Sequence, residues 1–175
     1  HSPAHSVDVP AFWMDRYEIT IAEYAAFLNE GGRDEHYRER MQSPELCGLI
    51  QEGPGEYRTL PGRGDYPIVF ATQADAQAYA ASRSKHLPSE AMWERAARGA
   101  EGRTYPWGEQ AINPHLANYD FHYGGTLPVG SFPGGVTPEG IHDLAGNVKE
   151  WTTSIFYPYP GGADYEHWFN FPFFS

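Results

Sequence analysis

The strongest constraint on this chain is a change of pattern at Gly99, because helical periodicity is not sustained anywhere beyond that residue. Up to that point, helix-start residues precede apolar residues at helical spacing. Beyond it, residues 101–175 are rich in glycine, proline, asparagine and aromatic residues, with short β-prone pieces such as 127–129. We therefore predict an α+β protein with helices in the N-terminal half and short strands and loops after them.

Three helices are predicted in the first hundred residues. The first begins after Thr20, which forms a capping box with Glu23. The second follows Thr72, and the third runs from Ser89 to Gly99. Before the first helix, residues 7–19 alternate in polarity and predict one or two short strands, and residues 67–70, before the second helix, predict another. Residues 33–66 are charged and rich in glycine and proline, which predicts a long irregular insertion.

The composition favours a single domain and excludes several functional classes. With 175 residues the chain can bury one hydrophobic core, and its 10 Phe, 12 Tyr and 5 Trp exclude the disordered class. A net charge of −11 repels nucleic acid and anionic membranes. No apolar run approaches 18 residues, so we predict no transmembrane segment; membrane association would need a partner or an unseen N-terminus.

Four stretches of the sequence, in this order, resemble the formylglycine-generating (sulfatase-modifying factor) family. They are the entry segment 12–27, the Leu-Pro-Ser-Glu segment 86–99, the Tyr-Pro-Trp-Gly segment 105–108 with Ala-Asn at 117–118, and the Pro-Val-Gly-Ser and Gly-Asn-Val segments within 128–152. The resemblance implies a C-type-lectin-like fold with little regular secondary structure. It also implies that residues 1–175 are one domain lacking the family's C-terminal strands.

The cysteine content departs from the family. In the enzyme that the chain resembles, two cysteines downstream of this region bind copper and activate oxygen. This chain has only Cys47, in the predicted insertion, so no internal disulfide forms and no copper is expected. Glu45 lies nearby and disfavours a thiolate, so Cys47 is predicted to be a free thiol rather than a nucleophile.

The resemblance implies a calcium site in the loop 143–150. In the family, side chains at the positions of Asp143 and Glu150 and backbone carbonyls at Gly146 and Val148 hold the ion. Calcium prefers six to eight hard oxygen ligands, which an irregular glycine-rich loop can supply. In the alternative interpretation Asp143 caps a turn, Asn147 adopts a left-handed conformation and Glu150 is solvated.

A second calcium site is the weaker prediction. The family uses an asparagine and the following carbonyl, which correspond to Asn118 and Tyr119, together with an aspartate further along the chain. Asp120 is the only carboxylate in the short loop that follows, up to residue 126.

The end of the chain is unusually aromatic. Residues 151–159 are predicted to join the core. For the segment 168–174 two interpretations stay open: core packing under the fold's closing strands, or a docking surface for a protein partner. The candidate partner-binding residues are Trp168, Phe169, Phe171, Phe173 and Phe174.

These features lead to three functional hypotheses. The main one is a non-catalytic, calcium-stabilised domain that serves as a binding module or as a subunit of a larger protein assembly. The alternative is an oxygen-dependent oxidoreductase of formylglycine-generating type whose catalytic C-terminal part is absent from this chain. Related oxygenases of the ergothioneine type add an iron-binding helical domain. A lectin-like domain that displays a ligand is the third hypothesis. The calcium prediction favours a periplasmic or extracellular location.

Overall fold

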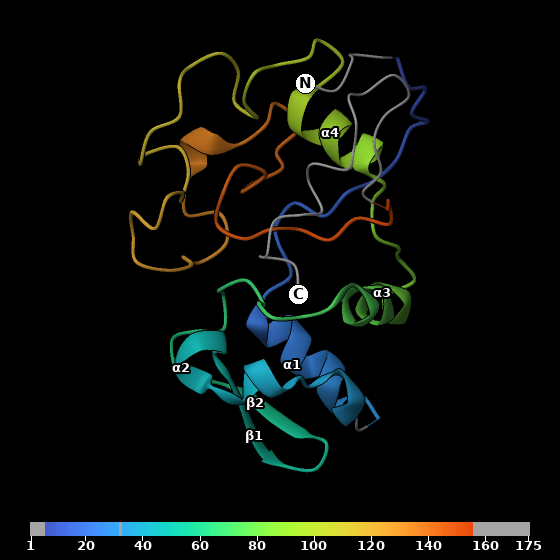
Figure 1. Ribbon diagram of the computed structural model, residues 1–175, viewed down its shortest axis with the longest axis vertical. Helices are drawn as coiled ribbons and strands as arrows, with labels where there is room; N and C mark the ends of the chain where they lie inside the picture. The colour runs from blue at the N-terminus through green and yellow to red at the C-terminus, as the bar shows by residue number, and fades with distance from the viewer. Residues whose placement is uncertain (1–5, 32, 156–175) are drawn as a thin grey trace, which may run out of the picture.

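The three predicted helices are present. The computed structural model describes residues 6–31 and 33–155, and its longer helices are α1 (Ile21–Asn29), α3 (Gln73–Ser82) and α4 (Glu90–Arg98) (Figure 1). Thr20 and Thr72 both complete capping boxes at the starts of α1 and α3. The hydroxyl of Ser89 accepts a hydrogen bond from the N–H of Met92 in the first turn of α4. Local capping chemistry therefore placed all three helix starts correctly.

The segment 33–66 is more regular than its composition indicates, so the prediction of an irregular insertion was wrong. Two antiparallel strands pair in it, β1 (Leu49–Gly53) and β2 (Glu56–Thr59), joined by a turn at residues 54–55. The Gly-Pro-Gly sequence at the turn closes this hairpin, although we had interpreted its glycine and proline content as a sign of an irregular loop. Short helical elements precede the hairpin: η1 (Asp34–His36), η2 (Glu39–Gln42) and α2 (Pro44–Cys47).

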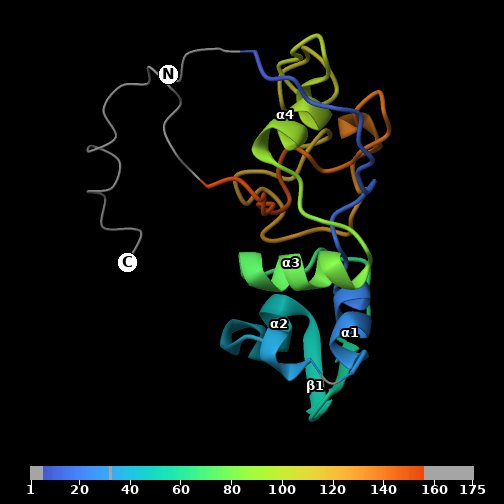
Figure 2. The ribbon, with the colours of Figure 1, turned by 90° about the vertical axis from the view of Figure 1, so that its right-hand side faces the viewer.

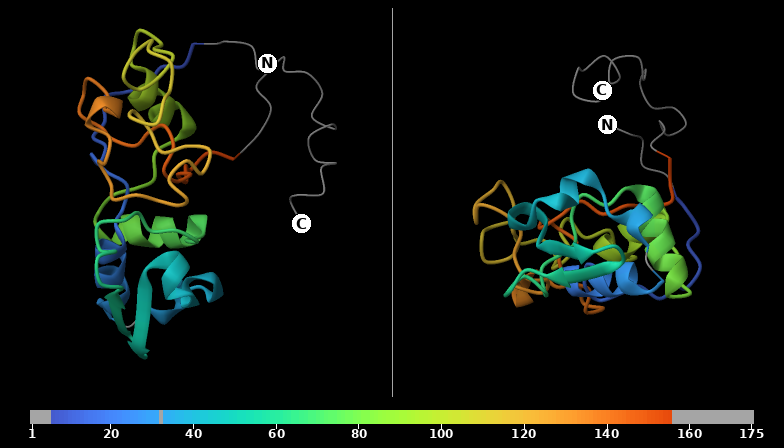
Figure 3. Two further views of the ribbon diagram at one scale, coloured as in Figure 1. Left: turned by 90° about the vertical axis from the view of Figure 1, so that its left-hand side faces the viewer. Right: turned by 90° about the horizontal axis from the view of Figure 1, so that it is seen from below.

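The lower half of the molecule in Figure 1 contains the main hydrophobic core. Figure 3 shows α1 and the hairpin side by side, with α3 lying across them toward the rest of the chain. Buried aromatic and aliphatic side chains from α1, η2, β1 and α3 meet between these elements: Tyr24, Phe27, Leu28, Met41, Leu49 and Tyr79. Burial of side chains of this size stabilises a fold by roughly 1.5–3 kcal/mol each, so this half is stabilised mainly by apolar packing.

A buried carboxylate joins η1 and η2 to α3 within this lower half. Asp75 is fully buried, and both of its oxygens are bonded to Arg38. The ring Nδ1 of His36 lies 3.0 Å from the same carboxylate. Burial opposes the charge, but the hydrogen bonds from Arg38, Thr72 and His36 lower the pKa of Asp75 well below its usual range.

The predicted strands at 7–19, 67–70 and 127–129 do not form among the described residues. The first of these segments forms no strand: single backbone hydrogen bonds join Arg16 to His142 and Ile19 to Ile68, and one bridge joins Thr20 to Pro67. Phe70 has a φ of +65°, which no strand residue adopts. The expected order of helices first and strands after is therefore wrong: both named strands precede α3.

The upper half consists of α4 and long loops (Figures 1 and 2). Its buried apolar cluster is small, with Ala96, Ala97 and Leu144 at the centre and Phe12 and Met14 packed against them. The protein is thus a mixed α/β structure with little regular secondary structure. None of the helices in the described part of the chain is long and apolar enough to cross a membrane.

Candidate functional site

Two loops far apart in sequence touch at the centre of the upper half. The N–H of Asn147 donates to the carbonyl of Asn118 at 2.8 Å. Gly146, with a φ of +101°, passes so close that a Cβ at this position would lie 2.2 Å from the Asn118 oxygen. Only glycine combines this backbone conformation with this approach. The crossing therefore explains the glycine of the Gly-Asn-Val motif.

The side chain of Asn147 connects four segments at this crossing. Its amide nitrogen donates to a carboxylate oxygen of Glu18 at 2.7 Å and to the carbonyl of Leu127 at 3.2 Å. Its oxygen accepts from the N–H of Leu127 at 2.9 Å and from the side chain of Asn118 at 3.1 Å. Every hydrogen-bonding position of this amide is used, which fixes the loops relative to one another.

Three carboxylates surround the crossing. Burial, together with the charges of Asp143 and Glu150, raises the pKa of Glu18 to about 8. Burial also raises the pKa of Asp143 and of Glu150. None of the three forms an ion pair with a described basic residue, so their ionised forms have no cation beside them and the protonated forms are favoured.

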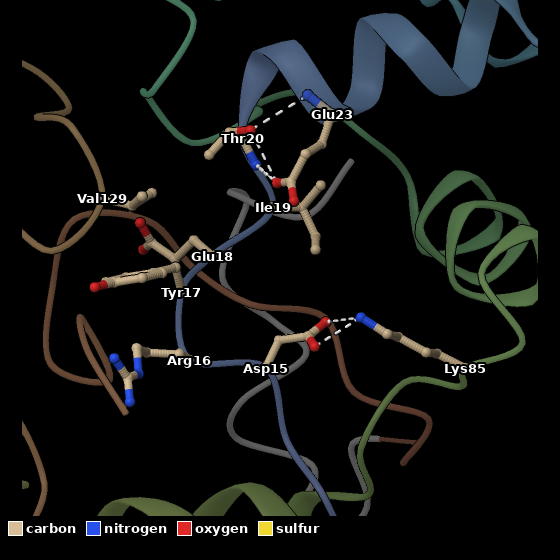
Figure 4. Close-up of a pocket in the computed structure, with 9 residues that line it drawn as sticks. All are labelled: Asp15, Arg16, Tyr17, Glu18, Ile19, Thr20, Glu23, Lys85 and Val129. Carbon is tan, nitrogen blue, oxygen red and sulfur yellow. Dashed lines mark hydrogen bonds and ion pairs between the residues drawn. The ribbon is translucent and has the colours of Figure 1, made fainter. Parts of the chain in front are cut away.

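A small pocket lies next to this carboxylate group. Its volume is about 230 Å³, and Figure 4 shows the residues that line it. An ion pair between Lys85 and Asp15, 2.7 Å long, lies on one side, and Glu18 and Val129 lie on another. Glu18 therefore belongs both to the pocket and to the loop crossing.

The structure holds the predicted ligands of the first calcium site in other hydrogen bonds. Asp143 is buried, has a φ of +59° and accepts from the N–H of Gly130 at 2.6 Å. Glu150 is exposed as a whole residue, but its carboxylate, which accepts from the indole N–H of Trp93 at 3.0 Å, is desolvated enough to raise its pKa. Gly146 and Val148 lie on the same loop, and Asn147 is left-handed as in the alternative interpretation. Within residues 6–31 and 33–155, no three or more His, Cys, Asp or Glu side chains gather around one metal position.

The residues of the second predicted calcium site differ in burial and do not all lie at the loop crossing. Asn118 is buried and donates to the carbonyl of Gly125 at 2.8 Å as well as to Asn147. Tyr119 is half-buried and Asp120 is exposed. The structure thus connects Asn118 to the first site and leaves Asp120 at the surface.

Glu18 is the residue of this site that we did not identify from the sequence. The sequence shows an acidic residue in the entry segment 12–27, and nothing local distinguishes it from Asp15 or Glu23. Its role arises from contacts with residues about 130 positions away. No periodicity or spacing rule encodes a contact of that separation.

Two further predictions concern Cys47 and the aromatic end. Cys47 is a free, fully buried thiol, and burial raises its pKa, which confirms that it is not poised as a nucleophile. Trp151 is half exposed rather than in the core, although its indole N–H donates to the carbonyl of Ala71. The segment 168–174 lies outside the described residues.

Comparison with known proteins gives consistent matches. The sequence profile of the family described as "Sulfatase-modifying factor enzyme 1-like domain" matches residues 1–168. A hercynine oxygenase of Mycolicibacterium smegmatis is 35% identical over 99% of this chain and 44% of its own length. A formylglycine-generating enzyme of Mycobacterium tuberculosis is 31% identical over 90% of this chain and 68% of its own length. The serine/threonine-protein kinase Pkn1 of Chlamydia trachomatis is 38% identical over 85% of this chain and 24% of its own length.

These matches overturn the hypothesis of a non-catalytic binding module or subunit. Relatives named hercynine oxygenase, 35–37% identical over most of the chain, favour the oxygen-dependent oxidoreductase instead. The error came from treating the missing cysteine pair as evidence about activity. The chain spans less than half the length of these relatives, so residues absent from it carry no information about the reaction.

Proposed function

Because this chain belongs to the sulfatase-modifying factor enzyme 1-like domain family, we propose that it is part of an oxygen-dependent oxidoreductase. The observation that carries the proposal is its 35% identity to a hercynine oxygenase along 99% of its length. The formylglycine-generating enzymes that it also matches are oxidoreductase relatives in the same family. A shared fold supports many activities, so the proposal depends on these relatives and not on the fold class.

The residues described here do not form a copper or iron centre. Copper in this family is held by a cysteine pair, and the single thiol of Cys47 is fully buried in the lower half. We infer that this chain supplies the folded support, and that the redox metal binds to residues elsewhere in the protein or in a partner chain. The hydrogen bonds between the loops at Asn118 and Asn147 would fix the surface that lies next to the redox metal centre.

Oxygen consumption by the protein encoded by the complete gene tests this function. We expect uptake with either hercynine or a cysteine-containing sulfatase-type peptide when iron(II) or copper(I) is supplied. The matched control is the same protein with Asn147→Asp, which places a fourth carboxylate at the crossing and should reduce turnover by an order of magnitude or more. Absence of uptake with both substrates and both metals would reject the proposal.

We also propose that the loop 143–150 binds calcium, as the family resemblance implies. The donor set suits this ion, because Asp143 and Glu150 supply carboxylates and Gly146 and Val148 supply carbonyls. The ionised forms of the carboxylates around Glu18 have no described cationic partner, and a divalent cation would supply one. Binding would exchange the hydrogen bonds to Gly130 and Trp93 for metal–oxygen bonds. The second site, at Asn118, Tyr119 and Asp120, stays a weaker proposal.

Thermal unfolding with calcium and with chelator tests both sites. At a calcium concentration 100 times Kd, binding stabilises the folded state by about 2.7 kcal/mol, which is roughly 5–10 °C in a chain of this size. Asp143→Asn keeps an acceptor for the Gly130 N–H and should abolish the shift. Asp120→Asn, the same chemical change at an exposed residue, should preserve it. A shift that survives Asp143→Asn and disappears in Asp120→Asn would assign calcium to the second site instead.

The detailed fold, the cellular location and the association with other proteins are proposals as well. We propose that the complete domain has the C-type-lectin-like fold, with residues 1–175 belonging to one domain. A periplasmic or extracellular location depends on the calcium proposal, because only outside the cytoplasm is calcium abundant enough for a weak site. Association with a further protein chain likewise remains a proposal.

A further inference from the structure

A short segment, residues 150–154, runs between the two halves of the molecule. In Figure 1 it is drawn in red, with α4 above it and α3 below it. It continues the loop 143–150, and the carboxylate of Glu150 accepts a hydrogen bond from the indole N–H of Trp93 in α4. The next four residues, 151–154, are bonded to the places where α3 and α4 begin.

Residues 151 and 152 are bonded to the start of α3. The indole N–H of Trp151 donates to the carbonyl of Ala71 at 2.8 Å, and the side-chain amide of Gln73 donates to the carbonyl of Thr152 at 2.6 Å. Ala71 directly precedes Thr72, the N-cap of α3, and Gln73 is the first helical residue. The two bonds therefore lie on either side of the helix cap.

Residues 153 and 154 repeat this arrangement at the start of α4. The N–H of Thr153 donates to the carbonyl of Pro88 at 2.8 Å, and the N–H of Glu90 donates to the hydroxyl of Ser154 at 2.9 Å. Pro88 directly precedes Ser89, the N-cap of α4, and Glu90 is the first helical residue. The first N–H groups of a helix have no partner within the helix, so Ser154 satisfies one that the local cap leaves free.

Apolar packing places α3 and α4 in different clusters. Tyr79 of α3 is buried in the main core of the lower half, whereas Ala96 and Ala97 of α4 belong to the small cluster of the upper half. Among the described residues the two clusters have no member in common. A hydrogen bond requires a narrow range of distance and angle, so bonds at both helix starts resist a shift of either helix. These bonds therefore fix what a shared core does not.

From this arrangement we propose that residues 151–154 form a clasp, a conformational device that holds the starts of α3 and α4 together and whose release lets the two halves move relative to each other. Four consecutive residues serve both helices, so release at one helix start weakens the bonds at the other. Each contact is a hydrogen bond at a half-buried or exposed position, and such a bond contributes only modestly to stability. The clasp can therefore open while the core of each half stays folded. Because it continues the loop 143–150, it also connects that loop to the start of α3.

Hydrogen exchange of the full chain tests whether the clasp opens as a unit. Gln73→Ala removes the donor to Thr152 at the α3 end and leaves the contacts at α4 unchanged. We expect the backbone amide of Glu90, at the α4 end, to exchange about fivefold faster, as the loss of one hydrogen bond would produce. Gln77→Ala makes the same change at an exposed position of α3. This matched control should leave the Glu90 amide at its wild-type rate.

Ser154→Ala provides the reciprocal measurement. It removes the acceptor of the Glu90 N–H at the α4 end, and the reporter is the indole N–H of Trp151 at the α3 end. We expect this indole proton to exchange faster by a similar factor. The control Ser131→Ala removes a hydroxyl that donates to Pro128 within its own loop, and it should leave the Trp151 indole unaffected.

Independent behaviour of the two ends would overturn the inference. If either Gln73→Ala or Ser154→Ala leaves the reporter at the far end at its wild-type rate, the four bonds are separate local contacts and not a clasp. Faster exchange that extends to the amides of α1 would overturn it as well, because it would indicate opening of the lower core. Faster exchange at both far ends, with α1 unchanged, is the result that the clasp requires.

Discussion

The two halves of this molecule keep their shape by different means. In the lower half, helices and a hairpin enclose a core of aromatic and aliphatic side chains that includes Tyr24, Phe27 and Leu28. In the upper half the buried apolar cluster centres on two alanines and one leucine. Hydrogen bonds take the place of a large apolar core in this half, and the side chain of Asn147 alone joins four segments.

This difference indicates how each half responds to substitution. Hydrophobic packing is additive and non-directional, so a core of this kind tolerates changes of surface charge and loses stability in proportion to buried volume. A network of loops depends on a few residues with specific conformations, so most positions are replaceable and a few are not. Three substitutions test this contrast, from the largest expected effect to the smallest.

Asp75→Asn should cause the largest loss, although it lies in the half stabilised by packing. The variant keeps the size of the side chain but removes the buried charge that Arg38 neutralises and that lies within hydrogen-bond distance of His36. We expect unfolding in urea to show a loss of about 3 kcal/mol. Glu30→Gln removes an exposed partner of Arg83 and serves as the control, with almost no change in midpoint expected.

The same residue predicts how the wild type responds to acid. Because the folded-state pKa of Asp75 is lowered, its contribution is present above the unfolded pKa and is lost as the pH falls through the folded value. Asp75→Asn should therefore differ most from the wild type at neutral pH and least in strong acid. An equal difference at both would show that lost packing, and not charge, causes the effect.

Gly146→Ala should disrupt the upper half and leave the lower half folded. Its new Cβ would overlap the backbone oxygen of Asn118, in a conformation that alanine disfavours. We expect a loss of at least about 2 kcal/mol, seen as faster hydrogen exchange at residues 117–119 with α1 unchanged. Gly124→Ala, at a φ of +73° with open space around it, should cost only about 1 kcal/mol. Equal losses would show that backbone strain alone, rather than the loop crossing, sets the requirement for glycine.

Glu18→Gln should have the smallest effect, visible as a change of pH dependence. The folded-state pKa of about 8 lies above the unfolded value, so the contribution of Glu18 to stability is largest in acid and is lost as the pH rises through 8. The side chain is partly solvated, so we expect this loss to be on the order of 1 kcal/mol in chelator-containing buffer. The glutamine variant should show a flat profile between pH 5 and 9. If added calcium leaves the wild-type slope intact, the ion does not bind near Glu18.

The helices were predictable from the sequence and the site was not, for a physical reason. A cap such as that of Thr20 and Glu23 is complete within four residues, so its chemistry can be read locally. The hairpin at 49–59 was also local, but its Gly-Pro-Gly turn was hidden in a polar stretch that we took as irregular. Glu18 and Asn147 meet only because the chain returns over more than a hundred residues, and the motif at 143–150 indicated importance without indicating which contacts it makes.

Cys47 gives this contrast a practical consequence. It is the single thiol of the chain and it is fully buried in the lower half, whereas the tryptophans of the described part of the chain, at positions 13, 93, 107 and 151, lie outside that core. A thiol reagent can reach Cys47 only when the lower half opens, and indole fluorescence reports on the upper half. The unmodified protein therefore carries two optical and chemical probes, one for each half, and their relative timing during unfolding reveals whether the halves separate before either one melts.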